Sequence, residues 1–103
     1  MGLFISKGII MCFIRPYDCG GCWSGTAIVK DETLYLFYAS IYTPEGADQI
    51  KQTVSVAYST DGIHFEKYAN NPIIACYPAE GGPDFRDPAV ACVDGRFYCV
   101  MAT

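Results

Sequence analysis

The chain has 103 residues, of which 51% are hydrophobic and 15% aromatic, so it is long enough for one small domain and too apolar for a disordered linker. Only 17% of the residues are charged and the formal net charge is −4, which excludes a protein that binds nucleic-acid phosphates through a basic face. An acidic chain with eight tyrosines is better suited to neutral polyols, because carboxylates accept hydrogen bonds from sugar hydroxyls.

The first predicted element is a short apolar run at residues 8–14, preceded by Lys7 and followed by Arg15-Pro16. The run is too short to cross a bilayer, and no small-residue cleavage site follows it, so it is a poor signal peptide. We interpret it as a buried strand. We therefore expect a cytoplasmic protein with no membrane partner.

Every other predicted element is also a strand, and no segment has a helical period. Turn signals at Asp31-Glu32-Thr33 and Asp61-Gly62 separate these strands. In the last strand, residues 64–68, polar residues are interleaved with apolar ones, as expected of an outer edge strand. The predicted strands of this part of the chain lie at residues 27–29, 34–38, 54–59 and 64–68.

A repeat follows these strands. The order of apolar strand, acidic turn and aromatic strand in residues 26–38 returns in residues 88–100, with an offset of 62 residues from Ala27 to Ala89. One period holds four antiparallel strands and a long loop, which is a β-propeller blade. The sequence thus predicts an all-β fragment of a propeller: the tail of one blade, one full four-stranded blade and the first half of the next. The alternative is a self-contained β-sandwich of about six or seven strands.

The six cysteines favour free thiols over a metal or redox site. Cys19 and Cys22 have the spacing of a zinc knuckle or a redox dithiol, but zinc needs a second pair or histidines, and His64 is the only histidine. We expect no metal and no cofactor, and we expect Cys92 and Cys99 to be reduced and packed among apolar neighbours.

A polar motif stands at the start of the first strand in each repeat: residues 22–26 in one and residues 84–88 in the other. The residue before a proline is pushed out of the helical region, so Asp87 is expected to be extended, with its carboxylate pointing out of the strand end. First strands of neighbouring blades lie side by side, so their ends should converge in one funnel. The side chains expected there are Trp23, Ser24, Arg86 and Asp87. Read without any family likeness, Asp87 could instead cap a turn or pair locally with Arg86.

Taken together, the motifs resemble those of glycoside hydrolase family 32, the β-fructosidases that include invertases, levanases, inulinases and sucrose-6-phosphate hydrolases. The resemblance covers roughly residues 15–103. Residues 17–26 match the family's Tyr-Asp-x-x-Gly-Cys and Trp-Ser-Gly-Ser motifs, with Thr26 in place of the last serine. Residues 57–72 match Ala-Tyr-Ser-x-Asp-Gly through Asn-Pro, and residues 85–88 match Phe-Arg-Asp-Pro.

The resemblance implies a five-bladed propeller with its active site in the central funnel, so residues 1–103 are expected to be part of that propeller domain. It implies that Asp87 stabilises the transition state through fructosyl hydroxyls, and that Trp23, Ser24 and Arg86 bind the fructose unit. The implied reaction is retaining hydrolysis of a terminal β-fructofuranosyl bond in sucrose or a fructan, with no cofactor.

Two catalytic motifs of the family are missing from the sequence. The nucleophile motif Asn-Asp-Pro-Asn and the acid/base motif Glu-Cys do not occur, and Glu45 and Glu80 lack that context. Because retaining hydrolysis needs two carboxylates about 5 Å apart, we expect the isolated chain to be inactive. Two alternatives remain: a non-catalytic carbohydrate-binding or assembly module that self-associates through open blade edges, or a five-bladed glycosidase or phosphorylase acting on another glycan.

Overall fold

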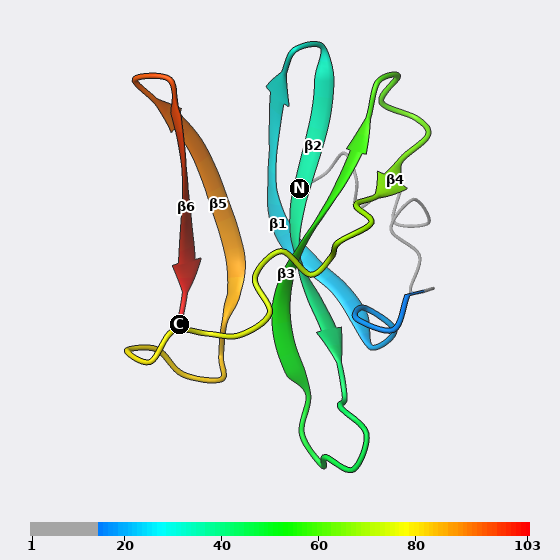
Figure 1. Ribbon diagram of the computed structural model, residues 1–103, viewed down its shortest axis with the longest axis vertical. Coiled ribbons are helices and arrows are strands. Elements are labelled where there is room, and N and C mark those ends of the chain that lie inside the picture. The colour runs from blue at the N-terminus through cyan, green and yellow to red at the C-terminus, as the bar shows by residue number, and fades with distance from the viewer. Residues whose placement is uncertain (1–14) are drawn as a thin grey trace.

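The computed structural model describes residues 15–103, and within that range every regular element is a strand (Figure 1). The strand expected at residues 8–14, and with it Cys12, lies outside the described residues. The strands are β1 (Gly21–Lys30), β2 (Thr33–Tyr42), β3 (Lys51–Ser59), β4 (Glu66–Lys67), β5 (Arg86–Val93) and β6 (Arg96–Ala102).

The first four strands form one antiparallel sheet in the order β1-β2-β3-β4, which is the complete blade that the repeat predicts. β1 and β2 are joined by Asp31 and Glu32, whose φ values of 51° and 61° lie in the left-handed region. Two consecutive left-handed residues match the right-handed twist of the flanking strands, so they make a tight hairpin turn. The sheet starts at Gly21, six residues before the predicted strand at residues 27–29.

The last two strands form a separate antiparallel hairpin beside the first sheet (Figure 1). Its turn repeats the chemistry of the first, since Asp94 and Gly95 have φ values of 51° and 77°. β5 packs mainly against β1, with further contacts with β2 and β3, while β6 lies beyond β5. This hairpin is the predicted first half of a second blade.

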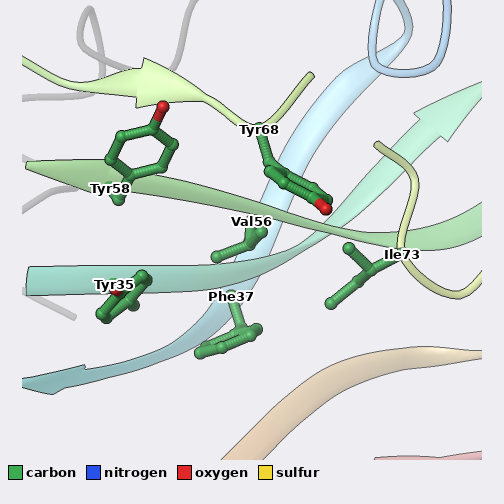
Figure 2. A pocket seen from close by; sticks show the side chains of 6 residues that line it. All are labelled: Tyr35, Phe37, Val56, Tyr58, Tyr68 and Ile73. Carbon is green, nitrogen blue, oxygen red and sulfur yellow. The ribbon is translucent and has the colours of Figure 1, made fainter. Parts of the chain in front are cut away.

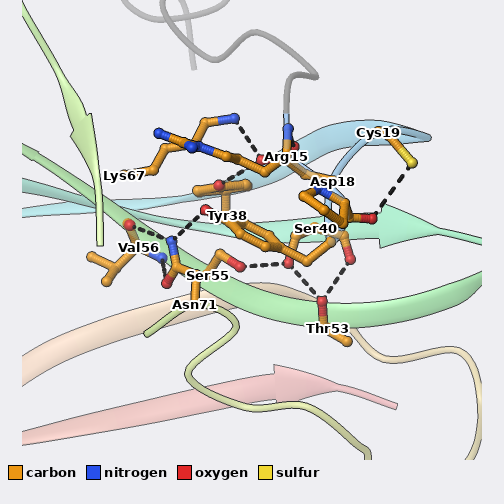
Figure 3. Close-up of polar contacts among 12 residues, drawn as sticks. Arg15, Asp18, Cys19, Tyr38, Ser40, Thr53, Ser55, Val56, Lys67 and Asn71 are labelled. Carbon is orange, nitrogen blue, oxygen red and sulfur yellow. Dashed lines mark hydrogen bonds and ion pairs between the residues drawn. The ribbon is translucent and has the colours of Figure 1, made fainter. Parts of the chain in front are cut away.

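Ile41 and Val54 are buried on one face of the four-stranded sheet, and Leu36, Tyr38 and Ala57 form an apolar core cluster on the other. Hydroxyl groups continue the same face, because Ser40 Oγ lies 2.6 Å from Thr53 Oγ1 and 2.7 Å from Ser55 Oγ (Figure 3). Buried hydroxyls are stabilising when they satisfy one another across neighbouring strands.

A buried carboxylate fastens the segment before β1 to the sheet. Asp18 is completely buried and accepts hydrogen bonds from the Tyr38 hydroxyl at 2.9 Å and from the Arg15 backbone N–H at 3.1 Å (Figure 3). It also forms an ion pair with Lys67 Nζ at 2.5 Å, which offsets the desolvation of the charge. Burial, and then the neighbouring Asp18 carboxylate, raise the pKa of the Tyr38 hydroxyl far above its usual range.

The fourth strand is much shorter than the predicted strand at residues 64–68, because the preceding loop is held in a bend. The Asp61 carboxylate accepts backbone N–H bonds from Ile63 and His64, each at 2.8 Å, and contacts His64 Nδ1 at 2.7 Å. Ser59, the last residue of β3, accepts a hydrogen bond from the Gly62 N–H through its Oγ at 2.8 Å. These bonds hold His64 out of the sheet, so only Glu66 and Lys67 pair with β3.

Beyond β4, the amide side chain of Asn71 makes the hydrogen bonds to β3 that a paired strand would make. Asn71 Oδ1 accepts the Val56 N–H at 3.0 Å, and Asn71 Nδ2 donates to the Val56 carbonyl at 2.8 Å (Figure 3). Farther along the same edge, Val54 N–H donates to the Ile74 carbonyl at 2.9 Å. The edge of β3 is therefore hydrogen-bonded beyond the point where β4 ends.

The expectation that Cys92 and Cys99 are packed among apolar neighbours is wrong. Both are exposed: Cys92 is one of the last three residues of β5, which are all exposed, and Cys99 lies in β6, which stands beyond β5. Nearby apolar residues are exposed for the same reason, including Tyr98 and Val100. The five cysteines within residues 15–103 are free thiols.

Candidate functional site

Each of the two polar motifs lies on a β-bulge. The pairing of β1 with β2 shifts between Trp23 and Gly25, which leaves Ser24 without a partner residue. The pairing of β5 with β6 shifts between Arg86 and Ala89, at Asp87 and Pro88. Bulges bend a strand and redirect its side chains, and they are frequent beside binding sites. The two motifs therefore share a local backbone feature as well as similar residue types.

The bulge in β1 depends on Gly25. A Cβ atom at this position would lie 1.7 Å from the Phe37 carbonyl oxygen of β2, so no other residue fits without moving the backbone. The close approach of the two strands at this point places Trp23 and Ser24 at the end of β1, where both are exposed.

Asp87 has a backbone conformation that the sequence did not predict. Its φ is 56°, in the left-handed region, whereas a residue before proline is normally extended. The bulge explains the difference: Pro88 is buried and Ala89 rejoins the ladder, so the chain direction has to change at Asp87. Aspartate tolerates this region better than most residues. The Asp87 side chain is exposed to solvent.

Arg86 and Trp23 meet across the boundary between the two sheets. The guanidinium carbon lies 5.9 Å from the centroid of the Trp23 ring, a cation–π contact between β5 and β1. Arg86 Nη1 also contacts Asp84 Oδ1 at 3.3 Å and donates to Gln52 Oε1 at 3.1 Å. Arg86 thus pairs with Asp84 and not with Asp87, which is contrary to the local-pair interpretation.

The structure therefore brings together Trp23 and Arg86 of the four predicted site residues. Ser24 follows Trp23 on the β1 bulge and Asp87 follows Arg86 on the β5 bulge, each exposed. Gln52 was not predicted from the sequence; it is 5% exposed and contacts the second motif from β3. The sequence shows only that a glutamine stands in the segment that forms β3, and this does not indicate which residues it contacts.

An apolar groove of about 440 Å³ lies elsewhere on the blade, away from the four predicted site residues (Figure 2). Its walls come from β2, β3 and the loop that follows β4, and its lining is Tyr35, Phe37, Val56, Tyr58, Tyr68 and Ile73. A sugar site needs several convergent polar groups, and here the Tyr58 hydroxyl is already bonded to Glu66 Oε2 at 3.1 Å. The groove is therefore mainly apolar and is not the candidate sugar site.

Within residues 15–103, no group of three or more His, Cys, Asp and Glu side chains is arranged to hold a metal ion. The same range contains no helix long and apolar enough to cross a membrane.

A complete antiparallel blade beside the first hairpin of a second blade defines an all-β chain that is part of a β-propeller. The exposed residues of the two motifs, Trp23, Ser24 and Asp87, lie at bulged strand ends. Residues 3–103 match the model of the glycosyl hydrolases family 32 N-terminal domain, and the chain belongs to this family. The fold class and the family resemblance read from the sequence are both confirmed.

Curated relatives cover most of this chain. A sucrose-6-phosphate hydrolase from Bacillus subtilis (strain 168) is 37% identical over 86 residues, which are 82% of this chain and 17% of that protein. A raffinose invertase from Escherichia coli is 40% identical over 88 residues, 82% of this chain and 18% of the invertase. The chain therefore spans less than a fifth of the length of these relatives.

Solved structures agree with the fold. A GH32 beta-fructofuranosidase from Bombyx mori superposes with a TM-score of 0.70 at 34% identity, over 78% of this chain and 17% of that one. A sucrose-6-phosphate hydrolase from Lactobacillus gasseri superposes with a TM-score of 0.75 over 85% of this chain and 17% of that one; at 24% identity it supports the fold alone.

Proposed function

We propose that this chain is part of a β-fructofuranosidase-like retaining glycoside hydrolase and forms one wall of its sugar-binding funnel. The observation that carries the proposal is the contact between Arg86 and Trp23, which joins the two motif-bearing strand ends across a blade boundary. Membership of the family and relatives named as sucrose-6-phosphate hydrolases and beta-fructofuranosidases support a fructoside, such as sucrose or a fructan, as the substrate.

Within this proposal, Asp87 is the catalytic residue of the chain and acts as a transition-state stabiliser. Its carboxylate is exposed and not paired with Arg86, so it is available to accept hydrogen bonds from fructosyl hydroxyls. Such bonds accelerate the reaction when they strengthen as charge develops on the sugar. Trp23 supplies an aromatic face, and Ser24 and Arg86 supply hydrogen-bond donors for substrate binding.

The 103-residue chain alone is proposed to be inactive. It holds neither the Asn-Asp-Pro-Asn nor the Glu-Cys motif of the family, and retaining hydrolysis needs both a nucleophile and an acid/base. We further propose that residues 1–103 belong to a single propeller domain and that the protein is cytoplasmic. The location is supported by the free thiols of the described residues.

The test compares the chain with a longer protein that joins it to the missing segments of the Bacillus subtilis relative. The chain alone should release no fructose from sucrose, and the longer protein should release it. In the longer protein, Asp87→Asn should lower kcat on the order of a hundredfold or more and change KM little. The matched control is Asp94→Asn, another exposed aspartate with positive φ, which should leave kcat unchanged. An unchanged kcat in Asp87→Asn would contradict the role.

A second candidate function, a self-associating module, is favoured by the free edge of β6. Within the described residues β6 pairs only with β5, and no charged side chain interrupts it after Arg96. Exposed edges with apolar side chains pair readily with another chain. If this candidate is correct, the chain should sediment as a dimer or larger species, and Val100→Lys should return it to a monomer. A wild-type monomer at every concentration would exclude it.

A further inference from the structure

Gln52 connects the first blade to the motif that carries Arg86 and Asp87. It lies in β3, and its amide oxygen accepts two hydrogen bonds from the segment that begins β5, from the Phe85 N–H at 3.0 Å and from Arg86 Nη1 at 3.1 Å. Gln52 and Phe85 are buried, with 5% and 3% of their surfaces exposed. A single buried oxygen thus holds both the backbone and a side chain of the neighbouring blade.

The contact decides where the Arg86 guanidinium lies. Both of its hydrogen bonds within the described residues use Nη1, one to Gln52 and the other to Asp84. The Asp84 side chain is 79% exposed, so water screens that pair and makes it weak. The bond to buried Gln52 is the stronger constraint, because hydrogen bonds to charged groups are worth more when solvent is excluded.

The same oxygen also constrains the backbone that leads to Asp87. Phe85 stands two residues before Asp87, directly before the bulge in β5. Because its N–H is bonded to Gln52, the chain enters the bulge from a fixed position.

We propose that Gln52 is a positioning residue of the fructoside site, which it does not touch: its amide oxygen holds Arg86 over Trp23 and fixes the backbone that presents Asp87. The link to fructosides rests on the proposed function, whereas the effect on Arg86 and Trp23 does not. The two parts can therefore be tested separately.

The first test uses Trp23 as a reporter, because it is the only tryptophan of the chain. Gln52→Met keeps the side-chain length and removes the acceptor oxygen, so Arg86 should leave the ring. The acrylamide quenching of Trp23 should increase to the level found in Arg86→Met. The ring-current shift of the Arg86 side-chain protons should be lost. Gln52→Glu retains acceptor oxygens at the same reach and should restore the wild-type signals.

The control is Thr53→Val on the same strand. Thr53 is fully buried, and its hydroxyl bonds to the Ser40 carbonyl at 2.9 Å on the opposite face of the sheet. This variant should lose stability but leave the Trp23 signals unchanged. Gln52→Asn provides a milder change if Gln52→Met does not fold, because the shorter amide cannot reach both donors. Unchanged Trp23 signals in a folded Gln52→Met or Gln52→Asn would overturn the proposal.

The second test uses the longer, hydrolytic protein. Gln52→Met should lower kcat/KM for sucrose about tenfold, the size expected for one buried hydrogen bond to a charged group, and Gln52→Glu should recover most of it. Loss of the Trp23 signals together with full activity would overturn the role of Gln52 in the fructoside site. If the Trp23 signals respond and the longer protein hydrolyses no fructoside, the positioning of Arg86 stands and the proposed function fails.

Discussion

The complete blade and the β5–β6 hairpin begin with the same pattern, yet they differ in burial. At the offset of 63 residues that relates Asp31 to Asp94, Leu36 of β2 corresponds to Cys99 of β6. Leu36 is 1% exposed, whereas Cys99 is among the exposed thiols. Alternation and acidic turns fix the strands and the hairpin in both regions, but burial depends on what packs against each face. Within the described residues, β2 has a paired strand on each side, whereas the hairpin packs against the blade mainly through β5.

The largest expected effect concerns one glycine from each of these regions, Gly25 and Gly95. Gly25→Ala should prevent the blade from folding or cost more than about 4 kcal/mol, because the new Cβ would lie 1.7 Å from the Phe37 carbonyl oxygen. Gly95→Ala should cost about 1 kcal/mol, because only its positive φ opposes the side chain and the space around it is open. Urea unfolding followed by circular dichroism measures both. Equal urea midpoints for the two variants would contradict the difference in packing between Gly25 and Gly95.

The matched repeat positions should give the next largest difference. Leu36→Ala should cost about 2–5 kcal/mol, because it opens a cavity in the buried core. Cys99→Ala should change the unfolding free energy by less than about 0.5 kcal/mol, because the side chain is exposed. A large loss in Cys99→Ala would show that β6 is more buried than the structure indicates.

A pair of tyrosines sharpens the comparison further. Tyr38→Phe should cost about 1–3 kcal/mol, because it leaves the buried Asp18 carboxylate with one hydrogen bond fewer. Tyr98→Phe in the hairpin should cost less than about 0.5 kcal/mol, because Tyr98 is 51% exposed. Thermal or urea unfolding of both variants provides the measurement. An unaffected Tyr38→Phe would mean that Lys67 and Arg15 alone satisfy Asp18.

The smallest expected effect is a pH dependence in the loop between β3 and β4. Hydrogen bonds from the His64 ring, and then from the backbone N–H groups of His64 and Ile63, hold the pKa of Asp61 well below its usual range. A lowered pKa stabilises the folded state above the unfolded pKa of about 4, and the contribution is lost as the pH falls below that value. When the pH is lowered from about 5 to about 3, the urea midpoint should decrease in both proteins, and the decrease should be smaller in Asp61→Asn than in the wild type. The same fall in both proteins would contradict this.

The sequence predicted the strands, the turns and the two motif ends because these depend on local periodicity and turn chemistry. It missed the Asp18–Lys67 pair and the Gln52 contacts because those partners are separated by 49 and by 33–34 residues. It missed the conformation of Asp87 because the rule for residues before proline is local, while the bulge is imposed by the pairing with β6. Burial of Cys92 and Cys99 could not be read from strand pattern alone.

The amide of Asn71 has a mechanical consequence. A two-residue strand would be an easy point from which to peel the sheet, because each backbone pair could open in turn under a small force. Asn71 clamps Val56 through a donor and an acceptor at once, and the Tyr68 N–H holds the same carbonyl at 3.0 Å. These bonds are loaded together when the outer edge is pulled, so the edge resists up to the point where all of them break at the same time.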